Sequence, residues 1–359
     1  MRDQALRRGC GSKGTLELYD SSVALDLTFL RRTRRESGRN VKSATLALLA
    51  VLSLLPTASA AQQSWPSRPI EIVVPFAAGG SIDITYRLIG PRLSQRLGQS
   101  VIILNKPGAG GTIGMSEVAR AAPDGHTLGA ASFAFAANSA VLKKLPFDPL
   151  KDFAPITMVA RAPLVLLVNT RTPPRTVPEF IDWVKSKPPG ELNYGSPGIG
   201  SSGHLMTELF LSRAGIKMTH IIYANGGTPG LVQGDIHLQF SPTPRAVGWI
   251  NDKRLAAIAV TSLEPDPIMP ELPPVSATLP GYDTYEWPGL VAPAKTPRNI
   301  IDRIQREIAQ IVTEPETRER LATLGSQPVA STPEELDAHI RKESALWAGV
   351  IRNLDLALR

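Results

Sequence analysis

The sequence of 359 residues has a single cysteine, Cys10, which lies within its first 60 residues. The rest of the chain therefore can form neither a disulfide nor a thiolate metal site. Aromatic residues are also few, at 6%, and we interpret the scattered tryptophans as packing anchors and not as a platform for stacking bases. The apolar run at 43–55 is shorter than the roughly 20 residues that a membrane-spanning helix needs.

A large excess of one charge is also missing once the N-terminal residues are set aside. The whole chain has 39 Lys and Arg against 32 Asp and Glu, and the first 60 residues hold 10 and 5 of these, which leaves 29 and 27 for residues 61–359. Such a balance lacks the basic surface on which nucleic-acid binding depends, so we expect no nucleic-acid partner. With 43% hydrophobic residues, the length and composition fit a globular protein of two domains.

The first 60 residues have the pattern of a secretory signal peptide. Residues 31–42 form a positive n-region, 43–55 an apolar h-region, and 58–60 ("ASA") a small-residue cleavage site before Ala61. No cysteine follows this site, so we expect no lipid anchor. We predict export to the periplasm, with the signal cleaved near Ala60.

The start of translation has an alternative. Residues 1–40 are long for an n-region, whereas "VKSATLALL" from Val41 would make a compact one. If Val41 is the initiation codon, residues 1–40 are not translated.

Strand-like and helix-like stretches alternate after residue 65. The pattern predicts βαβαβ units and an α/β fold with parallel strands. Apolar runs predict strands at 70–76, 100–105, 126–132, 164–169 and 255–262, and helical periodicity predicts helices at 112–122, 176–188, 202–213, 298–312 and 332–351. Because helices end the chain after two α/β regions, we expect it to enter a second domain and return. The expected domains are 61–165 with 288–359, and 166–287.

Two loops rich in small residues share one pattern. "VPFAAGGSID" (74–83) and "YGSPGIGSSGH" (194–204) each lead from a predicted strand into the start of a predicted helix. Backbone N–H groups and the positive end of a helix dipole at such a turn suit an anion. With one loop in each domain, the two helix starts would face one ligand across a cleft, without any need for Arg or Lys.

Two enzyme classes fit these loops poorly. "GIGSSG" (198–203) matches G-x-G-x-x-G, but His220 stands near the place where a ribose-binding acid belongs. Ser202 and His204 are two residues apart and do not face each other on a helix. His204 also replaces the last glycine of the G-x-S-x-G motif. We therefore expect no catalytic residue and no cofactor.

The five histidines give no sign of a metal centre. They lie at 126, 204, 220, 237 and 339, without a helical pair or an acidic cluster beside them. His204, at a helix start, is the one that we place near a ligand. We interpret His220 and His237 as structural residues.

The stretches "WPSRPIEIVVPFAAGGSID", "LNKPGAGGTIG", "LNYGSPGIGSSGHL" and "LPGYDTYEWPGLVAPAKTP" occur in this order. Over residues 65–356 the chain resembles the substrate-binding receptors of tripartite tricarboxylate transporters, the Bug receptors. The resemblance implies a two-domain periplasmic binding protein of the type II-like class, with a mixed sheet flanked by helices in each domain. It also implies a monomer that closes on a small organic acid, performs no catalysis and delivers the acid to membrane permease subunits.

The partner and the ligand remain open in the sequence. A ligand-sensing receptor that docks on a sensor ectodomain is an alternative to a transport receptor. Dicarboxylates, tricarboxylates, aromatic acids, acidic amino acids and uncharged amides all fit loops that bind through backbone groups.

The resemblance also implies the ligand-binding residues. In the first loop they are Phe76, Ala77, Ala78, Gly79, Gly80, Ser81 and Asp83. In the second loop they are Ser196, Gly198, Gly200, Ser201, Ser202 and His204. Ser132, after the strand at 126–132, is similar to a further lining position. For Asp83, an acid favoured by the helix dipole is an equally good interpretation.

One segment departs from the family. Residues 223–240 are several residues shorter than the usual stretch, and Pro229 and Gly230 weaken the helix expected there. Ser241 replaces the usual Asp or Asn. We expect a trimmed helix and an altered pocket edge, which would mean a changed ligand, a receptor that has lost function or a defective gene model.

Overall fold

The computed structural model describes residues 65–141, 145–223 and 227–353. Residues 63–359 form one compact unit. The predicted signal segment lies outside the described residues. Within the described part of the chain, no helix is long and apolar enough to cross a membrane.

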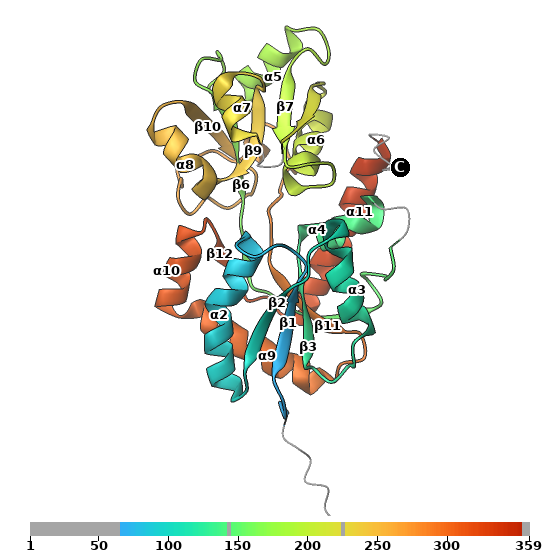
Figure 1. Ribbon diagram of the computed structural model, residues 1–359. Helices are drawn as coiled ribbons and strands as arrows, with labels where there is room; N and C mark the ends of the chain where they lie inside the picture. The colour runs from blue at the N-terminus through green and yellow to red at the C-terminus, as the bar shows by residue number, and fades with distance from the viewer. Residues whose placement is uncertain (1–64, 142–144, 224–226, 354–359) are drawn as a thin grey trace, which may run out of the picture. The chain divides into compact units, whose positions relative to one another are not determined.

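The first sheet has five strands in the order β2-β1-β3-β11-β4 (Figure 1). Strands β1, β2 and β3 are parallel, and β11 runs antiparallel to β3 and β4. The strands are β1 (Ile70–Val74), β2 (Val101–Asn105), β3 (Thr127–Ala131), β4 (Phe153–Met158) and β11 (Gly289–Pro293). The carboxyl ends of the three parallel strands meet at one edge, so the segments that follow them lie near one another.

Alternating side chains of β1 pack into the cores on opposite faces of this sheet. Ile70, Ile72 and Val74 contribute to a core that also contains apolar side chains of helices α2 and α9. Val73 contributes to the core on the other face, with side chains of α3, α4 and α11. The helices are α2 (Ser81–Leu97), α3 (Thr112–Arg120), α4 (Phe133–Val141), α9 (Arg298–Thr313), α10 (Pro315–Thr323) and α11 (Pro333–Asn353).

The second sheet has the order β10-β6-β9-β7-β8. Strand β7 is parallel to β8 and β9, whereas β6 is antiparallel to β9 and β10, so this sheet is also mixed. Side chains of helices α5 and α6 fill the core on one face, and side chains of α7 and α8 fill the core on the other. The elements are β6 (Leu164–Asn169), β7 (Asn193–Ser196), β8 (Thr219–Ile222), β9 (Leu238–Pro242), β10 (Leu255–Val260), α5 (Val177–Lys185), α6 (Ser202–Ala214), α7 (Thr228–Gln233) and α8 (Thr243–Asn251).

Four short elements complete the described structure. Strand β5 (Ala160–Arg161) pairs with β12 (Gln327–Pro328) in a two-stranded sheet. The 3-10 turns η2 (Ala109–Gly111) and η3 (Val275–Ala277) precede α3 and β11, respectively. Between the two large sheets, Ala162 and Glu286 form an isolated antiparallel bridge.

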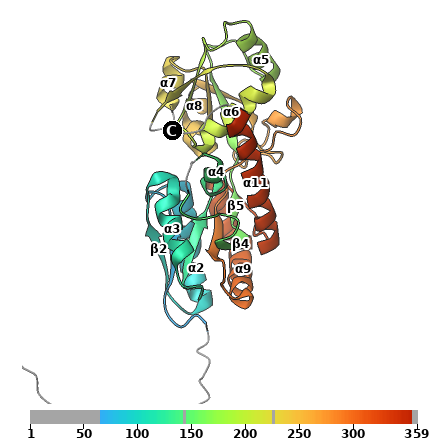
Figure 2. The ribbon, with the colours of Figure 1, turned by 90° about the vertical axis from the view of Figure 1, so that its right-hand side faces the viewer.

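Helix α11 contributes side chains to two cores. Leu336 and Ile340 pack on the first sheet, whereas Trp347 and Val350 belong to the core of the second. Figure 2 shows α11 beside α4 and β4, and it also contacts α6. The strands divide between the sheets close to the predicted domain boundaries. Because α11 packs into both cores, however, the boundaries themselves stay a prediction.

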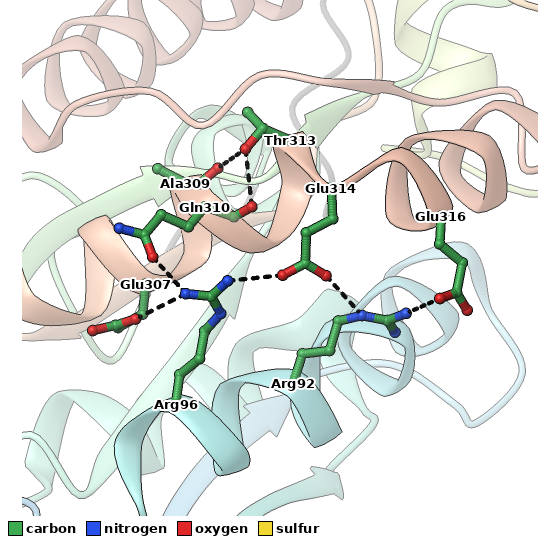
Figure 3. Close-up of polar contacts among 8 residues, drawn as sticks. All are labelled: Arg92, Arg96, Glu307, Ala309, Gln310, Thr313, Glu314 and Glu316. Atoms are coloured by element: carbon green, nitrogen blue, oxygen red, sulfur yellow. Dashed lines mark hydrogen bonds and ion pairs between the residues drawn. The ribbon is translucent and has the colours of Figure 1, made fainter.

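Ion pairs join helix α2 to α9 and α10 (Figure 3). The guanidinium of Arg92 contacts Glu314 at 3.0 Å and Glu316 at 2.7 Å. Arg96 contacts the other oxygen of Glu314 at 2.9 Å and Glu307 at 3.5 Å. Since solvent screens these exposed charges, each pair contributes little to the stability of the fold.

The segment that the sequence singles out as shortened does form a helix. Pro229 lies in the first turn of α7, where a missing N–H group leaves no hydrogen bond unmade. A side chain at Gly230 would meet the Tyr223 hydroxyl at 2.7 Å, so glycine makes room for this ring. Residues 224–226 lie outside the described residues. Ser241 is buried in β9.

Candidate functional site

The first predicted ligand loop lies at the carboxyl edge of the first sheet. Residues 75–80 connect β1 to α2, and Ser132 follows the neighbouring parallel strand β3. Ser132 is buried, and its carbonyl oxygen accepts a hydrogen bond from the N–H of Phe135 at 3.0 Å. The structure therefore places Ser132 and the first loop at the same edge of the sheet.

This loop presents free backbone donors. Ala77, Ala78, Gly80 and Ser81 are exposed, and their N–H groups have no acceptor among the described residues. Gly80 is the N-cap of α2 and provides no side chain to satisfy the first turn. Free N–H groups at the positive end of a helix dipole form a site for an anion such as a carboxylate.

Asp83 holds the loop in this shape. Its buried carboxylate accepts hydrogen bonds from the N–H of Gly79 (2.8 Å), from Nε of Arg87 (2.9 Å) and from Nδ2 of Asn105 (2.9 Å). Gly79 has a φ of 81°, a conformation that favours glycine. Asn105 also donates to the carbonyl of Phe76 at 3.2 Å. We therefore assign Asp83 a positioning role, because its oxygens already have partners in the loop, on α2 and on β2.

We expect Asp83→Asn to lower the melting temperature at pH 7. Burial raises the pKa of Asp83, but its hydrogen bonds to Arg87, Gly79 and Asn105 outweigh this effect, so the pKa falls from 3.8 to about 2. A lowered folded-state pKa stabilises the fold above pH 3.8, and this contribution is lost as the pH falls towards 2. It amounts to at most about 2 kcal/mol, and less because solvent screens the half-exposed Arg87.

The measurement is a series of thermal melts of wild type and Asp83→Asn between pH 3 and pH 8. The difference between the two proteins should be largest at neutral pH and shrink below about pH 4. The matched control is Asp182→Asn, because Asp182 is exposed on α5. A constant difference across the whole range would contradict the role of the Asp83 charge.

The second predicted loop uses some of its backbone donors internally. The N–H of Gly198 donates to Oγ of Ser196 at 3.2 Å, and the N–H of Gly200 to Nδ1 of His204 at 3.2 Å. Ser201 is the N-cap of α6, and its Oγ accepts from the N–H of His204 at 3.3 Å. N–H groups without an acceptor among the described residues also remain in this loop, those of Ile199, Ser202 and Gly203.

Aromatic rings stack beneath the second loop. The ring of His220 lies 4.8 Å from that of Tyr194 and 4.4 Å from that of His204, and Nε2 of His220 is 2.7 Å from Oγ of Ser196. Burial, and the repulsion that a protonated His204 would meet from a protonated His220, lower the pKa of His204 to about 4. Burial also lowers the pKa of His220. Both imidazoles are therefore neutral at pH 7, and His220 supports the predicted site by contacting Ser196, which periodicity alone does not reveal.

Ser202 has a partner that sequence reasoning missed. Its hydroxyl donates to Oε1 of Glu286, in the segment that crosses between the two sheets. Glu286 is partly buried, and burial raises its pKa, while the hydrogen bond from Ser202 and the charge of Arg245 lower it. Arg245 lies in the first turn of α8, after the carboxyl end of β9. No local motif marks either residue, because the contact joins positions 84 residues apart.

A pocket of about 340 Å³ lies elsewhere and contains none of the predicted ligand-binding residues. The guanidinium of Arg161 lies 5.9 Å from the centre of the Tyr285 ring. The pocket is lined by Met158, Arg161, Tyr285, Val329, Ser331, Glu335 and His339. Among the residues that the structure describes, no group of three or more His, Cys, Asp or Glu side chains is placed to hold a metal ion.

Two mixed sheets with ligand-loop candidates at their carboxyl edges define an α/β binding-protein fold. The sequence matches the tripartite tricarboxylate transporter family receptors over residues 85–356, and the chain belongs to this family. The predicted resemblance and the predicted fold class are thus confirmed.

Several relatives and solved structures are similar to this chain over most of its length. Protein BugT of Bordetella pertussis is 32% identical over 322 residues, covering 87% of this chain and 98% of that protein. The structure of Rpa4515 from R. palustris with adipate has 33% identity and a TM-score of 0.69, over 80% of this chain and 97% of that one. MatC from Rhodopseudomonas palustris with bound malate has 32% identity and a TM-score of 0.67, over 80% and 100%.

Proposed function

We propose that this protein is a solute-binding receptor that captures a small organic acid and delivers it to the permease subunits of a tripartite transporter. The observation that carries the proposal is the first loop, where exposed N–H groups without acceptors precede α2. A carboxylate bound there would gain several hydrogen bonds and a favourable interaction with the helix dipole.

Membership of the receptor family supports this function. The adipate and malate in the structures of Rpa4515 and MatC are both carboxylates. We propose the permease as the partner, in preference to a sensor ectodomain, because the family is described as receptors of a transporter. The same family supports a periplasmic location, reached through the predicted signal peptide, and a role without catalysis.

A thermal-shift screen of residues 61–359 against small organic acids and their amides tests the proposal. A ligand present at one hundred times its Kd should stabilise the fold by about 2.7 kcal/mol and raise the melting temperature by several degrees. Phosphate and chloride at the same ionic strength are the controls for nonspecific anion effects. A cooperative melt that no acid or amide shifts would contradict the proposed function.

A further inference from the structure

The pocket of about 340 Å³ described above lies where the chain crosses between the two sheets, away from the predicted ligand loops. Two of its lining residues, Arg161 and Tyr285, belong to the two segments that cross between the sheets. Backbone hydrogen bonds of 2.7 and 2.8 Å join these segments at Ala162 and Glu286. We call this cavity the crossing pocket, and its volume is at the lower end of the range of small-molecule sites.

Two stacked rings form one wall of the crossing pocket. The ring of His339, on α11, lies nearly parallel to that of Tyr285, with the ring centres 5.5 Å apart. Trp287 makes an edge contact with the same His339 ring at 5.0 Å. The hydroxyl of Tyr285 and Nδ1 of His339 have no hydrogen-bond partner among the described residues, yet neither atom is fully enclosed. Both are therefore open to a ligand.

Both rings are uncharged at pH 7. Burial lowers the pKa of His339 to about 4. Burial also raises the pKa of Tyr285 to about 12. The rings therefore offer hydrogen bonds without charge, and the charged side chains that line the pocket are those of Arg161 and Glu335.

Arg161 provides the positive group. Its Nε donates to Oε1 of Gln327 at 2.9 Å, and its Nη2 lies 3.5 Å from Oε1 of Glu264. The third nitrogen, Nη1, has no partner in the part of the chain that the structure describes. The bond to Gln327 orients the guanidinium, so a ligand carboxylate would meet a fixed and incompletely paired cation.

Glu335 provides the negative group, from a different element. It lies four residues before His339, so both side chains are on the same side of α11. Oε2 of Glu335 accepts from the N–H of Thr332 at 2.8 Å, which orients the carboxylate at the start of the helix. Oε1 has no partner among the residues described. This oxygen is therefore an acceptor for a ligand ammonium group.

We propose that the crossing pocket is a second binding site, which takes a small zwitterion with a carboxylate for Arg161 and an ammonium group for Glu335. A molecule with a single charge leaves one of these side chains without a partner, because the two have opposite charges and come from different elements. Amino acids are zwitterions of suitable size. This site goes beyond the proposed function and does not depend on it.

Isothermal titration of residues 61–359 at pH 7 tests this proposal. Leucine is compared with 4-methylpentanoate, which lacks the ammonium group, and with 3-methylbutylamine, which lacks the carboxylate. A second zwitterion, 6-aminohexanoate, separates its charges further and is compared in the same way with hexanoate and pentylamine. We expect at least one zwitterion to bind about tenfold more tightly than both of its single-charge analogues, the effect of one hydrogen bond between charged groups.

Variants locate the site of zwitterion binding, and a thermal melt of each checks its fold. Arg161→Gln should lower the affinity about tenfold, toward that of the amine, and Glu335→Gln by a similar factor, toward that of the acid. The controls are Arg318→Gln and Glu319→Gln, at exposed positions on α10, which should leave the affinity unchanged. Gly80→Asp, whose carboxylate would block the first ligand loop, should also leave it unchanged.

A zwitterion that binds no better than its single-charge analogues, or does not bind at all, would overturn the inference. Binding that both Arg161→Gln and Glu335→Gln leave intact would overturn it as well. If Gly80→Asp abolishes binding, the zwitterion occupies the first loop and not the crossing pocket. None of these outcomes bears on the capture of organic acids, which the thermal-shift screen tests by itself.

Discussion

Gly80→Asp should reduce ligand affinity at least a hundredfold while leaving the fold intact. Gly80 is the N-cap of α2, with a φ of −74° that any residue adopts. A Cβ atom there would meet the carbonyl oxygen of Ala77 at 3.5 Å, an ordinary contact. Aspartate is among the preferred N-cap residues, so its carboxylate would accept hydrogen bonds from the first turn of α2. It would thereby occupy the donors, and repel the charge, that we assign to the ligand.

Titration calorimetry with the best ligand from the screen measures this loss, and a thermal melt without ligand checks the fold. Gly80→Asn is the matched control, because asparagine also caps the helix but carries no charge. The difference between the two variants therefore isolates the effect of the added charge. Unchanged affinity in Gly80→Asp would remove the first loop from the site.

Local patterns predicted most of the fold because they reflect local physics. The apolar run at 70–76 and the periodic helix at 298–312 correspond to β1 and α9, whose buried faces follow from alternation and helical spacing. Helix α10 was not predicted, although Pro315 at its start is a favourable signal. Strand β4 was also missed, since Pro155 interrupts its apolar pattern.

The candidate site was predicted less completely, because its partners are distant in sequence. The pairing of Asp83 with Arg87 spans four residues on a helix and follows from spacing, but Asn105 reaches Asp83 only through the parallel pairing of β1 and β2. Glu286 accepts a hydrogen bond from Ser202 because Glu286 lies in the segment that crosses between the two sheets. The sequence could indicate which loops face a ligand, but not which of their hydrogen-bonding groups are already used.

Trp347→Ala should cause the largest loss of stability, because Trp347 lies on α11, which packs into two cores. Trp347 is fully buried, its ring lies 4.9 Å from that of Phe133, and its Nε1 donates to Glu343 at 2.8 Å. Removing this side chain leaves a large cavity, which costs about 3–5 kcal/mol. It also removes a donor from Glu343, whose pKa burial raises to about 7. We expect the melting temperature to fall by roughly 10 °C.

The number of thermal unfolding transitions is as informative as the melting temperature. Because α11 contributes to the cores of both sheets, the whole unit should melt in one transition, and Trp347→Ala should shift it as a whole. Trp183→Ala is the control, since Trp183 packs at the edge of the second-sheet core and is only partly buried, so its loss should cost less. Two separate transitions, of which Trp347→Ala moves only one, would show that the sheets unfold independently and that α11 does not couple them. One transition that Trp347→Ala shifts as a whole would instead show that the two sheets unfold together, as the packing of α11 into both cores predicts.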